Sequence, residues 1–146
     1  MRDFKDKIAF LPEPLRDRCI KAGNETGWRK NDVVDVIKHA RDSSLATLGG
    51  QIQYRFPDAT CELYWLSYDP SSRRPNEDWT SYCQRSAAEA ISKFRNLPDP
   101  AEIREHAKGF PAIKDKLEQG IDIDEYQVFI LYFVDEVRYQ TLGDSS

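Results

Sequence analysis

Two stretches of the chain repeat apolar residues with the spacing of an amphipathic helix. The first covers residues 32–41, with Asn31 available as its N-cap. The second covers residues 77–97, with Asn76 as the expected cap. Its apolar stripe consists of Trp79, Cys83, Ala87, Ala90, Ile91, Phe94 and Leu97. A stripe of this length predicts a helix that packs against a sheet.

Shorter helices are predicted on either side of these two. Proline and glycine delimit residues 13–22, 100–108 and 111–119. Proline is favoured at the first turn of a helix, whereas glycine adopts the left-handed conformation that ends one. Asp99 and Glu102 have the spacing of a capping box. We therefore expect several short helices in addition to the long one.

A β-hairpin is predicted at about residues 50–68. Ile52, Tyr54 and Phe56 alternate with polar residues, as in a strand with one buried face, and residues 57–60 have turn chemistry. The second half of the hairpin, residues 61–68, is rich in residues that suit a strand.

The aromatic residues of this second strand alternate poorly. Simple alternation would place Leu63 and Trp65 on one face and Tyr64, Leu66 and Tyr68 on the other. Apolar residues would then lie on both faces. We expect this strand either to be covered on both sides or to expose aromatic residues to a partner.

A further strand is expected at about residues 126–134, which are rich in Val, Ile, Phe and Tyr. With the hairpin it would form a small antiparallel sheet packed against several helices. The predicted fold class is therefore α+β.

The length of 146 residues corresponds to a single domain over residues 1–146. The longest apolar run, Val128 to Val134, is far shorter than the roughly 20 residues that a membrane-spanning helix needs. The charged N-terminus leads into no apolar segment of the kind found in secretory signals. We expect a cytoplasmic protein that does not interact with membranes.

The sequence contains no recognisable catalytic or cofactor motif. Cys19, Cys61 and Cys83 form no C-x-x-C pair and are expected to be reduced and buried. His39 and His106 lack metal-ligand spacing, and no glycine-rich phosphate loop is present. We expect no metal, no cofactor and no enzymatic activity.

Two features could still suggest a ligand. Asp122 and Asp124 lack the ligand spacing and the glycine of an EF-hand loop. Arg73 and Arg74 stand outside any wider basic tract, which is a weak indication of nucleic-acid binding. Neither cation binding nor nucleic-acid binding is expected.

Negative charge is concentrated in the last third of the chain. The net charge is −4, and residues 99–146 contain more acidic than basic side chains. The densest acidic part consists of Asp115, Glu118, Asp122, Asp124 and Glu125. Such carboxylates are either an ordinary solvated face or a surface that attracts a basic protein partner. We predict that they form the partner-binding site.

A family resemblance points the same way. Residues 49–58 (GGQIQYRFPD), residues 61–66 (CELYWL) and the helix from Trp79 to Leu97 resemble immunity proteins of bacterial contact-dependent inhibition and polymorphic toxin systems. The resemblance implies a cognate toxin domain, often a nuclease, that is bound and blocked stoichiometrically. Tyr68, Tyr126 and Tyr139 are candidate aromatic anchors for that interface.

Two other classes of function stay open. One is a small enzyme with a Cys–His pair or a carboxylate site formed only in the fold. The other is a homo-oligomeric structural or regulatory domain that uses the aromatic hairpin as its interface.

Overall fold

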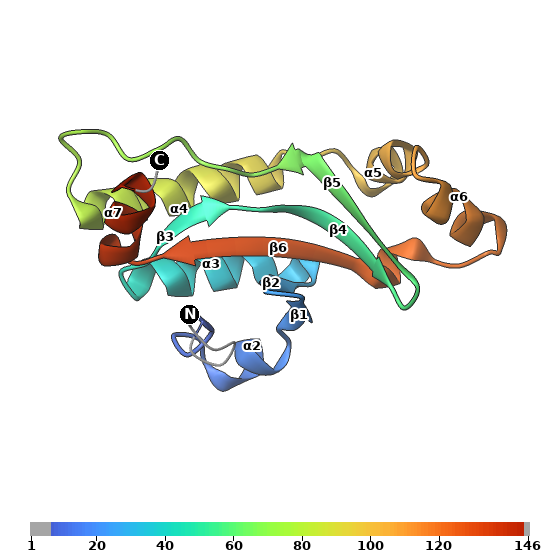
Figure 1. The fold of residues 1–146 in the computed structure, drawn as a ribbon, viewed down its shortest axis with the longest axis horizontal. Helices are drawn as coiled ribbons and strands as arrows, with labels where there is room; N and C mark the ends of the chain where they lie inside the picture. The colour runs from blue at the N-terminus through green and yellow to red at the C-terminus, as the bar shows by residue number, and fades with distance from the viewer. Residues whose placement is uncertain (1–6, 145–146) are drawn as a thin grey trace.

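The computed structural model describes residues 7–144 and shows an α+β fold (Figure 1). The strands are β1 (Ile20–Ala22), β2 (Glu25–Trp28), β3 (Ala46–Gly49), β4 (Gln51–Phe56), β5 (Ala59–Ser67) and β6 (Gln127–Val134). The helices are α2 (Glu13–Asp17), α3 (Val33–Asp42), α4 (Trp79–Arg95), α5 (Pro100–Ala107), α6 (Pro111–Glu118) and α7 (Glu136–Asp144). Two 3₁₀ turns, η1 (Lys30–Asp32) and η2 (Ile123–Tyr126), precede α3 and β6.

The strands form a six-stranded antiparallel sheet in which β6 is central. One edge of β6 pairs with β2, and the other pairs with β4 and then with β3. The strand order is β1-β2-β6-β4-β5. The predicted α+β class, the hairpin and the strand near residues 126–134 are all confirmed, and β1, β2 and β3 are additional. Central pairing explains why β6 is apolar along almost its whole length.

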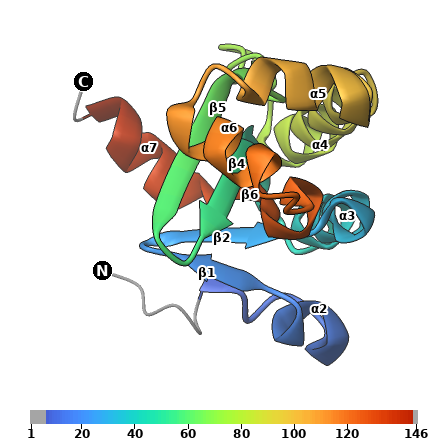
Figure 2. The ribbon, with the colours of Figure 1, turned by 90° about the vertical axis from the view of Figure 1, so that its right-hand side faces the viewer.

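Helices cover one face of the sheet. In Figure 2, α3, α4 and α5 are gathered on the same side of β4 and β5. The main core lies between these layers, with the rings of Phe94 on α4 and Phe129 on β6 in edge contact at 5.4 Å. A separate small cluster forms around Val128 and Ile130, whose side chains belong to the opposite face. We call that second side of the sheet the open face.

Gly49 and Gly50 join β3 to β4. Both have positive φ, 112° and 159°. A Cβ atom on Gly50 would lie 1.7 Å from the carbonyl oxygen of Ile130, and one on Gly49 would lie 2.0 Å from Asp69. The Tyr68 hydroxyl donates a hydrogen bond to the same Ile130 carbonyl at 2.5 Å. This close approach of backbones requires glycine.

A bulge in β5 accounts for the poor alternation of its aromatic residues. Leu63 pairs with Ile52 and Ser67 pairs with Gln51, so the residues between Leu63 and Ser67 have no partner on β4. The bulge shifts the alternation by one position. Leu63, Leu66 and Tyr68 are consequently buried, whereas Tyr64 and Trp65 are both exposed. The strand is thus not covered on both sides but exposes aromatic residues, which was the second of the two expectations.

The predicted helix at residues 13–22 is wrong beyond Asp17. Residues 20–22 form β1, and the Gly23 turn with φ of 66° leads into β2. Pairing of β1 with β2 outweighs the weak local helix preference of this segment. The longer helices start and end within a few residues of their predicted bounds. The cap of α4 is Asp78 rather than Asn76, because the Asp78 carboxylate accepts the backbone N–H of Ser81 at 2.7 Å.

Arg85 on α4 holds the loop between β5 and α4. Its guanidinium donates to the carboxylate of Glu77 at 2.6 and 2.8 Å and to that of Glu89 at 2.7 Å. It also donates to the backbone oxygens of Ser71 and Ser72. The hydrogen bonds from Arg85 lower the pKa of Glu77 to about 2, and the backbone N–H of Ser71 together with Arg85 lowers the pKa of Glu89 to about 2. The loop is therefore fastened to α4 by one charged network.

Replacing Gly50 with alanine is expected to destabilise the fold by about 3 kcal/mol, because the new Cβ would overlap the Ile130 carbonyl. Denaturant unfolding measures the loss. Gly109→Ala is the matched control, since its Cβ would meet His106 at an ordinary 3.6 Å. Equal stability of the two variants would contradict the close contact between Gly50 and β6.

The free energy of unfolding is expected to fall as the pH drops from about 4.5 to about 2. In this range, Glu77 and Glu89 take up protons more readily in the unfolded chain than in the folded protein. Above this window, the contribution of both groups is fully present. The Glu77→Gln/Glu89→Gln variant should show a shallower pH dependence of its melting temperature. Glu118→Gln/Glu125→Gln, which alters exposed carboxylates, should keep the slope of the parent.

Candidate protein-binding surface

One end of the molecule is built from α5, α6, η2 and the β4–β5 turn, at the right of Figure 1. We call it the helical end. Ion pairs join its elements: Lys116 on α6 lies 2.9 Å from Asp58 in the turn, and Arg104 on α5 lies 2.8 Å from Asp124 in η2. The side chains of Ile103 and Ile113 are buried beneath it. These ion pairs and buried side chains hold α5, α6, η2 and the β4–β5 turn together as one surface.

Exposed aromatic residues lie where β5 meets the helical end. Tyr64 is 72% exposed and Trp65 is 43% exposed. The Trp65 ring stacks on Phe110 with a centroid distance of 6.0 Å, and its indole N–H donates to Nδ1 of His106 at 3.2 Å. Tyr64 packs edge-on against Trp65 at 5.2 Å. Contacts to both α5 and the start of α6 therefore hold Trp65 in place on the surface.

The predicted carboxylates Asp115, Glu118, Asp122, Asp124 and Glu125 all belong to the helical end. Asp115 and Glu118 lie one turn apart on α6, and both are exposed, as is Glu125. None of these three forms an ion pair within residues 7–144.

The other two carboxylates have structural partners. Asp124 pairs with Arg104, and Asp122 accepts the backbone N–H of Asp124 at 3.1 Å as the cap of η2. Lys114 and Lys116 also lie on α6. The structure therefore brings the predicted residues to one end, which also contains the basic side chains of Arg104, Lys114 and Lys116. Asp115, Glu118 and Glu125 are the carboxylates that stay available to a partner.

The aromatic anchors suggested by the sequence are not the exposed ones. Tyr68 is fully buried, Tyr126 packs against Phe56 at 5.0 Å, and Tyr139 accepts the backbone N–H of Arg73 at 3.2 Å. Tyr64 and Trp65 take that place. The irregular alternation of residues 63–66 was the signal that pointed to them, since a strand bulge exposes neighbouring side chains.

Cys61 and Cys83 are buried, as expected, whereas Cys19 is only partly buried. Burial raises the pKa of Cys19 and of Cys83 to about 11, and it also raises the pKa of Cys61. A catalytic cysteine needs the opposite shift, because the thiolate is the nucleophile. Within residues 7–144, no three His, Cys, Asp or Glu side chains come together as a metal site.

Arg73 is occupied by intramolecular contacts. Its guanidinium donates to Glu136 at 3.0 Å and to the backbone oxygen of Glu77 at 3.0 Å, and it lies over the ring of Trp79. It is therefore not available as a phosphate ligand. No helix in the described part of the chain is both long and apolar enough to cross a bilayer.

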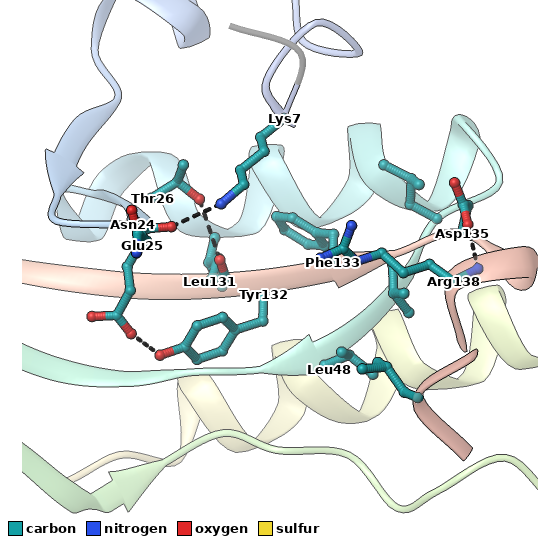
Figure 3. Close-up of a pocket in the computed structure, with 13 residues that line it drawn as sticks. Lys7, Asn24, Glu25, Thr26, Leu48, Leu131, Tyr132, Phe133, Asp135 and Arg138 are labelled. Carbon is teal, nitrogen blue, oxygen red and sulfur yellow. Dashed lines mark hydrogen bonds between the residues drawn. The ribbon is translucent and has the colours of Figure 1, made fainter. Parts of the chain in front are cut away.

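A cavity of about 250 Å³ lies at the other end of β6 (Figure 3). Its walls combine Lys7, the β1–β2 turn, β6 and α7, and they contain groups of both charges, including Lys7, Glu25, Asp135 and Arg138. Lys7 donates to the backbone oxygen of Asn24 at 2.9 Å. Among residues 7–144, no histidine or cysteine lines the cavity, and histidine is the side chain that most often transfers protons near neutral pH.

Comparison with known proteins does not assign this chain to a family. It matches no protein-family model, no curated protein and no solved structure. The resemblance to immunity proteins therefore stays a prediction, and function has to be inferred from the surface itself.

Phe110→Ala is expected to destabilise the protein by about 2 kcal/mol, because it removes a half-buried ring and the stacking partner of Trp65. The fluorescence emission should shift to the red as Trp65 becomes more exposed to water. Denaturant unfolding and emission spectra measure the two effects. Tyr64→Ala should leave stability within about 0.5 kcal/mol, since Tyr64 is mostly exposed.

Proposed function

We propose that this protein is an immunity protein that binds a cognate toxin domain in the cytoplasm and blocks it stoichiometrically. The toxin is a basic, nuclease-like domain, and the helical end is the surface that covers its substrate cleft. The observation that carries the proposal is the exposed pair Tyr64 and Trp65, which a strand bulge and α5 position beside α6.

The aromatic pair has the properties of an interface anchor. Large aromatic residues contribute most of the binding energy in many interfaces, particularly when they are held in place before binding. Trp65 is fixed by stacking on Phe110 and by its hydrogen bond to His106, so little side-chain entropy is lost when a partner covers it. Tyr64 offers a ring and a hydroxyl that a partner can bury.

The exposed carboxylates supply attraction over a longer range. Asp115 and Glu118 on α6, with Glu125 in η2, present negative charge at the same end as the aromatic pair. A nuclease cleft is basic because it binds phosphates, and complementary charge raises the rate of encounter. The aromatic residues would then determine how slowly the complex dissociates, and the carboxylates how quickly it forms.

The proposal is tested with the toxin domain encoded by the reading frame immediately upstream. Binding kinetics with the full chain should show a 1:1 complex whose association rate falls as salt is added. Tyr64→Ala should weaken binding about thirtyfold, equivalent to about 2 kcal/mol, mainly through faster dissociation. Toxin activity should be lost at equimolar immunity protein.

A charge variant separates the two contributions. Asp115→Asn/Glu118→Gln should slow association severalfold at low salt and leave dissociation unchanged. Asp17→Asn is the matched control, because Asp17 is an exposed carboxylate on α2, away from the helical end. An association rate insensitive to salt, or a partner that Tyr64→Ala binds as well as the parent does, would contradict the proposal.

A second candidate is self-association through the same hairpin. β5 is the outermost strand on its side of the sheet and exposes Tyr64 and Trp65. Two copies could therefore meet through this surface. Light scattering across a dilution series distinguishes the two candidates, because an inhibitor of the proposed kind is a monomer and a self-associating domain shows a concentration-dependent mass.

A further inference from the structure

The cavity at the end of β6 exists because two neighbouring strands differ in length. β2 pairs with β6 only from Phe129 to Leu131, whereas β6 continues to Val134. Within residues 7–144, no strand pairs with this edge of β6 beyond Leu131. The β1–β2 turn bounds the space on one side and α7 on the other, which leaves a cavity of about 250 Å³ (Figure 3).

Apolar side chains form much of the cavity wall. Leu131 and Val134 of β6 are buried beneath it, and Leu142 of α7 is about half exposed. The apolar lining consists of Leu45, Leu48, Leu131, Phe133, Val134 and Leu142. A ligand with an apolar body would remove part of this surface from water, which is favourable.

The two carboxylates of the wall already accept hydrogen bonds. Glu25 accepts one from the Tyr132 hydroxyl and one, at 3.1 Å, from the side-chain amide of Gln53. Asp135 accepts the backbone N–H of Arg138 at 2.8 Å, in the first turn of α7. Both carboxylates therefore have donors within the protein.

The two basic side chains of the wall have donors to spare. Lys7 Nζ donates to the backbone oxygen of Asn24 at 2.9 Å, which uses one of its three hydrogens. The Arg138 guanidinium forms no hydrogen bond and no ion pair with residues 7–144. Figure 3 shows both side chains extending toward the same stretch of β6 from different walls. Unused cationic donors thus lie beside an apolar surface.

We propose that this cavity binds a small monocarboxylate that carries an apolar chain. Lys7 and Arg138 would bind the carboxylate, because charge-assisted hydrogen bonds from ammonium and guanidinium groups are the strong ones. The apolar chain would cover Leu48 and Leu142. The cavity would thereby bury its exposed apolar side chains and satisfy its unused donors with one molecule.

Size and charge narrow the class of ligand. A volume of about 250 Å³ is below the roughly 300–1,000 Å³ of sites for drug-sized molecules, so the ligand must be small. Glu25 and Asp135 contribute negative charge to the same wall, and they would repel a phosphate dianion more than a carboxylate. The cavity lies at the opposite end of β6 from the helical end, so this binding does not depend on the proposed toxin.

Calorimetric titration of the full chain with sodium octanoate tests the proposal. The expected result is saturable binding of one octanoate per chain, with a matching rise in melting temperature. Two related probes separate the contributions of charge and of apolar surface. 1-Octanol lacks the charge and butanoate has a shorter chain, so each should bind at least about tenfold more weakly than octanoate.

Arg138→Gln should weaken octanoate binding at least about tenfold, and Lys7→Gln should weaken it in the same direction. Because Arg138 is exposed, the melting temperature of the ligand-free Arg138→Gln variant should match that of the parent. The matched control is Arg95→Gln, which removes an exposed arginine on α4 and should bind octanoate like the parent.

Three results would overturn the proposal. The first is the absence of a saturable response of the parent to millimolar octanoate. The second is binding of 1-octanol as tight as that of octanoate, and the third is an equal response of Arg138→Gln and Arg95→Gln.

Discussion

The backbone of Gly50 lies directly against the carbonyl of Ile130, and this contact organises the sheet around β6. Next to it, β3 and β4 follow each other along one edge of β6 in a common register, from Gly49 opposite Tyr132 to Ile52 opposite Phe129. The Tyr68 hydroxyl reaches the same carbonyl, and the Asp69 carboxylate accepts the backbone N–H of Gly50 at 2.9 Å. The end of β5 is thereby fixed to the joint between two other strands.

The exposed aromatic pair is a consequence of that attachment. β5 is held at Ser67 beside Gln51 and again at Leu63 beside Ile52, which leaves the residues between them without partners on β4. The bulge places Tyr64 and Trp65 on the surface in succession, while Leu66 still reaches the core. Phe110 and His106 then fix Trp65 from the helical side. A backbone contact inside the sheet thus determines the feature on which the proposed interface rests.

Charge has different roles in different parts of the molecule. Around Arg85 it fastens a loop, and at Arg104 it joins α5 to η2. Asp115 and Glu118 are solvent-exposed and suited to attraction at a distance. On the open face of the sheet, the carboxylates of Glu25 and Glu62 instead share the uncharged side-chain amide of Gln53.

Local sequence patterns were sufficient for the α+β class, for the helices from α3 to α6, and for β4, β5 and β6. Amphipathic spacing and capping residues act over a few neighbours and can be read along the chain. They also placed the predicted carboxylates together in one short segment.

Only the tertiary structure decided which of those groups are available. β1 and β3 are short strands that exist because β2 and β6 pair with them, and residues 20–22 lack a local signal for that pairing. Asp124 pairs with Arg104, which lies 20 residues earlier in the chain on another element. The Gln53 amide donates to Glu25, which lies 28 residues earlier on β2. Whether a side chain is free, paired or buried depends on such distant contacts, which alternation and spacing along the chain do not encode.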